Sequence, residues 1–238
     1  MHRFIWDVHS TPPQALENEF PISAIVHNTV LHPLGARALP GTYTVKLTVD
    51  GQSYTQPLTV KMDPRIKSSP EDLRKQHDME IGAVEGMDES FQSLEQVKSV
   101  RAQIKELAVK AKGKENLVKG LETLDQQCAE LEGSAQRASF GVPPSGKRPE
   151  NFSTLNQHFS GILAVADSSD SAPTTQATAA YKEVEENADG LRKRWSALRE
   201  RELLDLNGEL KTAGLPAIDP KKPLTEELGG ASEGDDEP

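Results

Sequence analysis

Apolar residues recur at every second position between residues 41 and 60, the pattern of a half-buried β-strand. The alternation is interrupted at Asp50-Gly51, a dipeptide suited to a type I′ turn because both of its residues tolerate positive φ. The pattern therefore predicts a two-stranded hairpin. A two-residue loop at this position pairs Leu47 with Tyr54 and gathers the apolar side chains of both strands on one face.

The same register places Thr44 opposite Pro57 in a non-hydrogen-bonded pair, so Pro57, which has no N–H, points away from its partner strand. The second strand is therefore predicted to be an edge. Ahead of the hairpin, "RFIWDV" and "ISAIVH" are apolar enough for strands, but prolines separate them. We expect residues 4–8 and 22–26 to cover the apolar face of the hairpin, with help from the helices or from another chain, because a hairpin alone is marginally stable in water.

From residue 70 onward the apolar spacing changes to steps of three and four, which is typical of packed helices. The sequence "KSSPEDL" starts the first helix, with Ser69 as its cap and Pro70 at the first position. We expect helices over residues 70–111, 114–136, 151–168 and 173–212. In the last helix a five-residue step from Leu198 to Leu203 breaks the phase of the apolar stripe.

Helix lengths leave two arrangements open. At about 1.5 Å per residue, the first and last helices each span roughly 60 Å, and the two short ones together span about the same. An up-down-up-down bundle would place the short pair over one end, whereas a three-row bundle would place them end to end. The helix lengths favour the up-down-up-down bundle.

Composition and charge exclude several functions. The formal net charge of −10 disfavours binding to a phosphate backbone, and six of the acids lie in the last thirteen residues. Those residues belong to a Pro-, Gly- and acid-rich stretch over 215–238 that we expect to be disordered. No apolar run is long enough to span a membrane, and the first residues do not resemble a signal peptide.

The candidate chemistry is weak throughout. The stretch "GVPPSGKR" at residues 141–148 almost matches a phosphate-binding loop, but Arg148 replaces the required hydroxyl residue, so we interpret it as a plain loop. The histidines have no metal-ligand spacing. Cys128, the only cysteine, sits on an apolar stripe and is interpreted as a small buried hydrophobe. The helix carboxylates Glu80, Glu85, Asp88, Glu89 and Glu95 are interpreted as a solvated face. We therefore predict no catalytic, cofactor-binding or metal-binding residues.

The stretches "HRFIWDVHSTPP" and "ISAIVHNTVLHPLGARALPGTYTVKLTVDGQSYTQPLTVKMDPRI" resemble the C-terminal region of bacterial exported proteins with BNR/Asp-box propellers, which are sortilin- and sialidase-like and often labelled glycosyl hydrolases. In that family a propeller leads into an immunoglobulin- or fibronectin-like sandwich and then a helical region. The segments "APTTQATAAY" and "LNGELKTAGLPAID" also resemble its helical tail. The Asp-box motif itself is missing, so no catalytic residue transfers.

The resemblance, combined with the residue patterns, predicts an α+β chain. Residues 1–65 are expected to form a small partial sandwich, residues 69–214 an antiparallel bundle of three to four helices, and residues 215–238 the acidic tail. The resemblance also implies that the chain is a truncated piece of a longer architecture. It further implies a periplasmic or extracellular location.

Three functions remain as hypotheses. The first is a non-catalytic accessory or interaction module that scaffolds, dimerises or docks a propeller. In this hypothesis the chain itself is not an enzyme, although related full-length proteins are often labelled glycosyl hydrolases. The second is a carbohydrate-binding part of a glycoside-acting enzyme, with Trp6 and Tyr54 as candidate ligand-facing aromatics. The third is helical self-association through the long stripes of the first and last helices.

Overall fold

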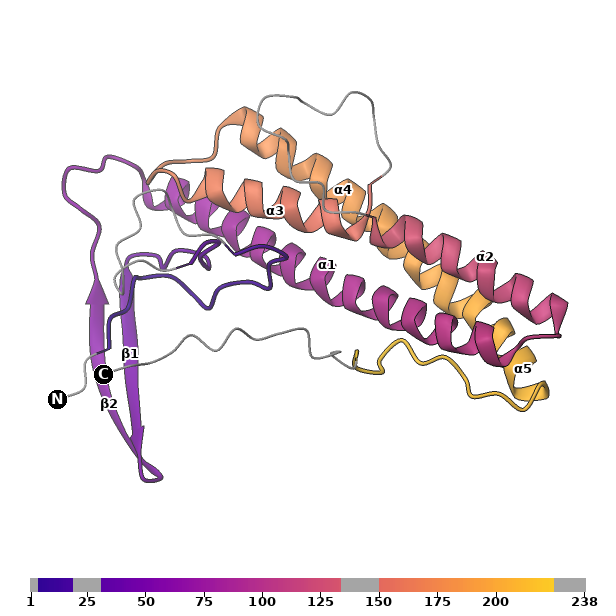
Figure 1. The fold of residues 1–238 in the computed structure, drawn as a ribbon. Coiled ribbons are helices and arrows are strands. Elements are labelled where there is room, and N and C mark those ends of the chain that lie inside the picture. The colour runs from indigo at the N-terminus through magenta and orange to yellow at the C-terminus, as the bar shows by residue number, and fades with distance from the viewer. Residues whose placement is uncertain (1–3, 19–30, 134–149, 225–238) are drawn as a thin grey trace, which may run out of the picture. The chain divides into compact units, whose positions relative to one another are not determined.

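The computed structural model describes residues 4–18, 31–133 and 150–224. The chain is α+β, with a two-stranded antiparallel hairpin followed by four helices packed together (Figure 1). The elements run as follows: β1 Gly41–Val49, β2 Gln52–Val60, α1 Pro70–Lys110, α2 Glu115–Glu132, α3 Phe152–Ala166, α4 Thr175–Ala197, the π-helix η1 Leu198–Glu202 and α5 Leu203–Thr212.

The hairpin has the predicted register. Leu47 pairs with Tyr54, Tyr43 with Leu58, and Thr44 with Pro57. Asp50 and Gly51 adopt φ values of 50° and 79°, the left-handed conformations that a type I′ turn needs. Pro57 has no N–H, so it leaves a gap in the row of backbone donors along the edge of β2 that faces away from β1. The register predicted from the period-two pattern places Pro57 in this way.

The described residues do not contain the predicted β-sandwich. Within the described residues, β1 and β2 form the only ladder, and an isolated bridge joins His9 to Arg37. Residues 4–8 do not form the expected covering strand: they pair with neither β1 nor β2, Phe4 and Ile5 are exposed, and Val8 takes φ 63°. The other expected covering strand, residues 22–26, lies outside the described residues, as does the loop at residues 141–148.

The helices match the predicted segments to within a few residues. Ser69 and Asp72 form a reciprocal cap at the start of α1, in which the Asp72 N–H donates to Ser69 Oγ over 3.1 Å. Gly113 follows α1 with φ 93°, a conformation that favours glycine. Polar capping residues and a glycine stop therefore set the limits of the longest helix.

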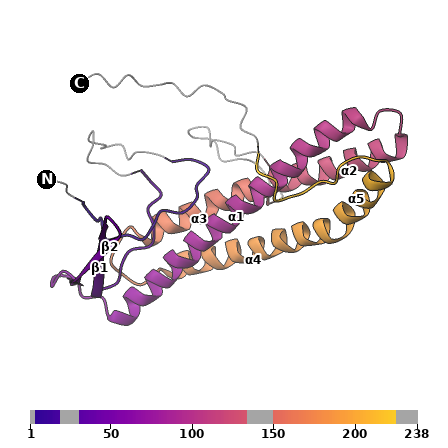
Figure 2. The ribbon, with the colours of Figure 1, turned by 90° about the horizontal axis from the view of Figure 1, so that it is seen from below.

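The chain divides into two compact units, each built from two separate stretches of sequence. One comprises Met1–Gln92 with Gly133–Lys193, and it holds the hairpin together with α3. In this unit α3 runs antiparallel to α1: Gln76 Nε2 donates to the Ala166 carbonyl, and Asn156 Nδ2 to the Met87 carbonyl. Figures 1 and 2 both show α3 beside the first part of α1.

The second unit comprises Ser93–Glu132 with Arg194–Pro238. Here α2 lies against the second part of α1, and Arg101 forms ion pairs with Asp125 at 2.8 Å and Glu132 at 2.5 Å. Each short helix thus accompanies a different part of α1.

The five-residue step in the last helix is the site of η1. The Leu203 N–H donates to the Leu198 carbonyl, the i→i+5 hydrogen bond of a π-turn. The wider turn absorbs the extra residue, so Leu198 and Leu203 are both buried, as are Leu206 and Leu210 beyond them. The phase break in the sequence is therefore a local π-helix within a continuous helical segment.

The expectation of a disordered tail from residue 215 does not hold for its first residues. Ile218 is buried, and its backbone exchanges two hydrogen bonds with the Asn207 side chain, at 2.7 and 3.0 Å. Gln103 and Ser99 of α1 bind the carbonyls of Asp219 and Lys222. These side-chain hydrogen bonds hold the backbone of residues 218–222, which has no regular secondary structure. Residues 225–238 lie outside the described residues.

Candidate functional site

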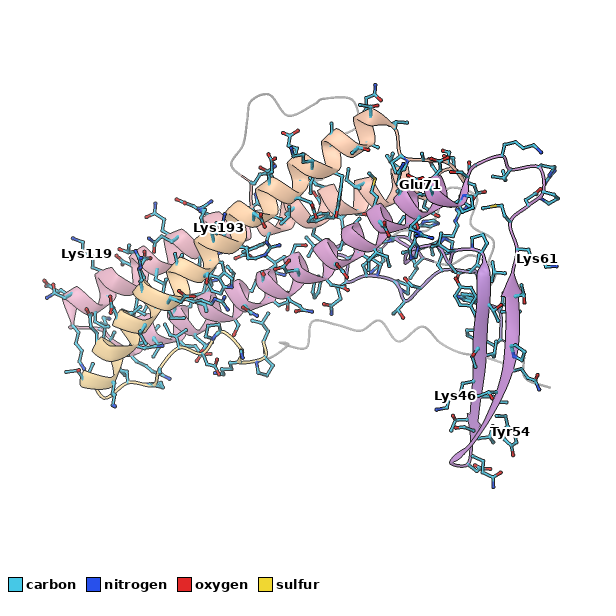
Figure 3. All side chains as sticks on the ribbon, turned by 180° about the vertical axis from the view of Figure 1, so that it is seen from behind. Lys46, Tyr54, Lys61, Glu71, Lys119 and Lys193 are labelled. Atoms are coloured by element: carbon cyan, nitrogen blue, oxygen red, sulfur yellow. The ribbon has the colours of Figure 1, made fainter. Side chains whose placement is uncertain are left out.

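The two predicted ligand-facing aromatics have different environments. Trp6 is half-buried: its ring packs edge-to-face on Tyr43, with centroids 5.6 Å apart, and its indole N–H donates to the His9 carbonyl. Tyr54 is 57% exposed, and its hydroxyl donates to Gln52 of the same strand. Figure 3 labels Tyr54 in the part of the hairpin nearer the turn. Trp6 is thus used in packing, whereas the ring of Tyr54 is open.

Tyr54 belongs to an apolar surface that we call the hairpin face. It consists of the apolar side chains on one side of the two strands: Tyr43, Val45, Leu47, Val49, Tyr54 and Leu58. Leu47 is 59% exposed and Val45 51% exposed, although both lie on the side predicted to be covered. Large contiguous apolar surfaces are uncommon on monomeric proteins, so the exposure of the hairpin face makes it a candidate contact surface.

A polar cluster around Asp167 is the second candidate. The Asp167 carboxylate accepts from Arg37 Nε at 2.9 Å and from His9 Nε2 at 3.2 Å, and Arg37 Nη1 reaches Asp170 at 2.9 Å. His9 Nδ1 also faces a carbonyl, that of Asp7. Asp167 follows α3, whereas its partners come from the segments before β1. The cluster therefore ties those segments to the end of α3.

Glu80 extends this cluster into the core and corrects one prediction. It was interpreted as part of a solvated helix face, yet it is only 1% exposed. Its carboxylate accepts from the Arg37 backbone N–H at 2.7 Å and from Gln76 Nε2 at 2.9 Å. Burial raises the pKa of Glu80, and the two hydrogen bonds only partly oppose that effect. The prediction was wrong because a carboxylate with two donors can replace an apolar residue in a buried stripe.

Glu80 therefore predicts a specific pH dependence. The folded protein holds the Glu80 proton more tightly than the unfolded chain, so the free energy of unfolding falls as the pH rises from the unfolded pKa through the folded one. Glu80→Gln removes this titration. We expect the stability of the wild type relative to Glu80→Gln, measured by urea unfolding, to decline as the pH rises above 4.5, the ordinary pKa of a glutamate.

The matched control is Glu85→Gln, which removes a carboxyl from an exposed position of the same helix. Glu80→Ala, which leaves the Arg37 N–H and Gln76 without their acceptor, should cost about 2–4 kcal/mol at neutral pH. A wild-type advantage over Glu80→Gln that grows with pH would contradict the assignment.

Asn156 is a third buried polar group, and the sequence patterns missed it. It is 1% exposed and makes four hydrogen bonds. Its Nδ2 donates to the carbonyls of Gln14 and Met87 and to Ser90 Oγ, and its Oδ1 accepts from the Leu16 N–H. One side chain thus joins α3, α1 and the N-terminal segment, which is a structural role.

Among the hollows of the described residues, the one beside the polar cluster is small, whereas two along the helices are larger and open. The cavity beside Glu80, Arg37 and His77 has about 20 Å³, enough for about one water. Two open hollows of about 630 and 550 Å³ are lined by α2 and by the residues from Glu202 to Ala213, with charged side chains of both signs. These are ordinary surfaces of amphipathic helices.

The sole cysteine of the chain, Cys128, is buried. Burial raises the pKa of Cys128 to about 12, so its thiol stays protonated and is a poor nucleophile. Among the residues the structure describes, no group of three or more His, Cys, Asp or Glu side chains could hold a metal ion. No helix in the same part of the chain is both long and apolar enough to cross a membrane.

Comparison of this chain with protein-family models, with curated proteins and with solved structures finds no match.

Proposed function

We propose that this chain is a non-catalytic accessory or interaction module whose contact surface is the hairpin face. The observation that carries the proposal is the exposure of this face: Leu47 and Tyr54 pair directly and are both more than half exposed. Transfer of such side chains out of water is favourable by about 25 cal/mol per Å². A partner that covers the face would gain this free energy.

The polar clusters support the non-catalytic part of the proposal. Arg37, Asp167 and Glu80 are engaged with one another or with backbone groups of the same unit. The adjoining cavity accepts about one water, far less than the several hundred Å³ of an ordinary ligand pocket. These side chains are suited to holding the segments before β1 against α1 and α3.

The sequence resemblance suggests where such a module acts. In the BNR-type proteins that it resembles, the equivalent region follows a propeller in an exported protein. We therefore propose a periplasmic or extracellular accessory module in which the hairpin is the last part of a partial immunoglobulin- or fibronectin-like sandwich. The remaining strands of that sandwich come from outside the hairpin.

The test uses a purified Asp-box propeller from a protein of the resembled kind, with binding measured by biolayer interferometry. We expect binding that Leu47→Lys weakens at least about tenfold, because a lysine at the contact loses apolar area and must be desolvated. Thr48→Lys adds the same charge on the opposite face and should bind like the wild type. Absence of binding, or equal losses in both variants, would count against a propeller contact through this face.

A carbohydrate-binding function is the second candidate, and the open ring of Tyr54 favours it, since sugars stack on exposed aromatic rings. A glycan screen with the wild type, Tyr54→Ala and Trp6→Ala separates the two functions. Helical self-association has less support, because stripe residues of α1 and α4 such as Leu94, Val97 and Leu191 are already buried within the chain.

A further inference from the structure

We infer that the hairpin face binds the hairpin face of a second copy of this chain, forming a two-fold symmetric, two-layer sandwich of four strands. This inference rests on the proposed function because it uses the same contact surface, and it assigns a second copy of the chain, in place of a propeller, as the partner of that surface. It follows from the charge, the area and the shape of the face.

The face carries no charge. The side chains on this side of β1 and β2 are apolar apart from Gln52 and Gln56, whereas Lys46 lies on the other side. The whole chain carries a net charge of −10, so most contacts between two copies would bring like charges together. A charge-free face can meet its own copy without that repulsion, and it offers nothing to attract a charged partner.

The exposed area is enough for a weak dimer. Five side chains of the hairpin face are exposed: Val45, Leu47, Val49, Tyr54 and Leu58. At their exposed fractions they offer on the order of 500 Å² from each copy, or about 1,000 Å² in a symmetric pair. This total is near the lower limit of about 1,000 Å² for a specific interface, which fits a dimer that dissociates in the micromolar range.

The shape also fits a second copy. Each strand has nine residues and is about 30 Å long, so the covering layer must be an apolar sheet of similar length. A second hairpin supplies such a sheet at the usual spacing of about 10 Å between packed layers. Two hairpins stacked in this way share one core, whereas a single two-stranded hairpin is marginal in water. A lipid surface fits less well, because anionic membranes repel an acidic chain.

The test is sedimentation velocity on the full chain from about 1 μM to about 1 mM, with a dimer dissociation constant expected in the micromolar range. Leu47→Lys should weaken the dimer at least about 30-fold, because it places a lysine at the centre of the interface. Thr48→Lys, the neighbouring position on the opposite face, should leave the dissociation constant within about twofold. Equal losses in both variants overturn the inference, as does a monomeric wild type.

A second measurement covers the case in which Leu47→Lys merely unfolds the hairpin. A spin label on Lys46→Cys lies outside the interface, and buried Cys128 stays unlabelled. The dimer predicts a distance of roughly 20–40 Å between the two labels, from the layer spacing plus the label arms. Absence of any inter-protomer distance at concentrations where the wild type sediments as a dimer overturns the hairpin contact.

The outcomes also separate this inference from the proposed function. A wild-type monomer that binds the propeller in a Leu47-dependent way refutes the dimer and leaves the interaction module standing. A monomer that becomes a dimer when residues 19–30 are deleted assigns the face to that segment of the same chain and overturns the inference. A monomer that co-sediments with neutral lipid vesicles assigns it to a membrane and overturns it too. A monomer with no partner of any kind removes both proposals.

Discussion

Deletion of Glu200 is expected to leave the protein folded, with the free energy of unfolding changed by about 1 kcal/mol or less. Deletion of Gln126 is expected to cost more than about 3 kcal/mol. Both residues are exposed and helical, and each deletion removes one residue from a helix. The difference arises from the local hydrogen-bond pattern: Glu200 lies in the π-turn of η1, whereas Gln126 lies in the regular α-helix α2.

Deletion of Glu200 shortens the step between Leu198 and Leu203 from five residues to four. A four-residue step closes the i→i+4 hydrogen bond of an ordinary α-helix and keeps the buried leucines of α5 in phase with Leu198. The surface hydrogen bond from Ser196 to Glu200 is lost at little cost. The deletion therefore removes the irregular turn without changing which residues are buried.

Deletion of Gln126 has no irregular turn to absorb it. In α2 the buried residues Leu117, Leu121, Leu124, Cys128 and Leu131 follow steps of four and three. Removing one residue after Leu124 rotates everything that follows by about 100°, which turns Cys128 and Leu131 away from the core. Urea unfolding of both variants, with m-values to confirm equal folded compactness, measures the difference. Equal losses of stability in the two variants would show that η1 is fixed by its surroundings.

The substitution Asn156→Asp is expected to cost about 3–5 kcal/mol at neutral pH. The two side chains have nearly the same shape, so packing is preserved. An ionised carboxylate cannot donate, however, and Nδ2 of Asn156 donates to three acceptors, among them the carbonyls of Met87 and Gln14. The variant therefore places a buried negative charge against oxygen atoms that have lost their donor.

The control is Asn116→Asp, which adds the same charge at an exposed position in the first turn of α2, where a negative charge is favourable. Its stability should stay within about 0.5 kcal/mol of the wild type. The Asn156→Asp loss should shrink on acidification, because a protonated carboxyl regains one donor. A small loss at neutral pH that does not vary with pH would mean that Asn156 exchanges its partners for water.

The hairpin and the helices could be predicted because their determinants are local. The period-two pattern with Asp50-Gly51 fixes the register, and the steps of three and four fix the helices. The phase break at Leu198 was visible as a five-residue step, although the pattern does not say that a π-turn resolves it. What no local pattern supplies is a cover for the hairpin face, because strand pairing across long stretches depends on residues far apart in sequence.

The buried polar residues of α1 were missed for a different reason. A stripe drawn through apolar residues alone includes Ile81, Val84 and Phe91, which are only half-buried. Counting back from Leu94 in steps of four and three instead reaches Glu80 and Gln76. Strict spacing was thus the signal that could have found Glu80. Asn156 offered no such signal, because its partners come from the distant segment at residues 14–16 and from α1.

The proline on the outer edge of β2 limits how far this chain can polymerise. The backbone of β1 has an outer edge without a proline, whereas Pro57 removes a donor from the corresponding edge of β2. Two molecules that joined their β1 edges would therefore present a proline-interrupted edge on either side. Growth into a fibril would stop at the pair, so the hairpin can expose apolar residues without acting as a template for open-ended assembly.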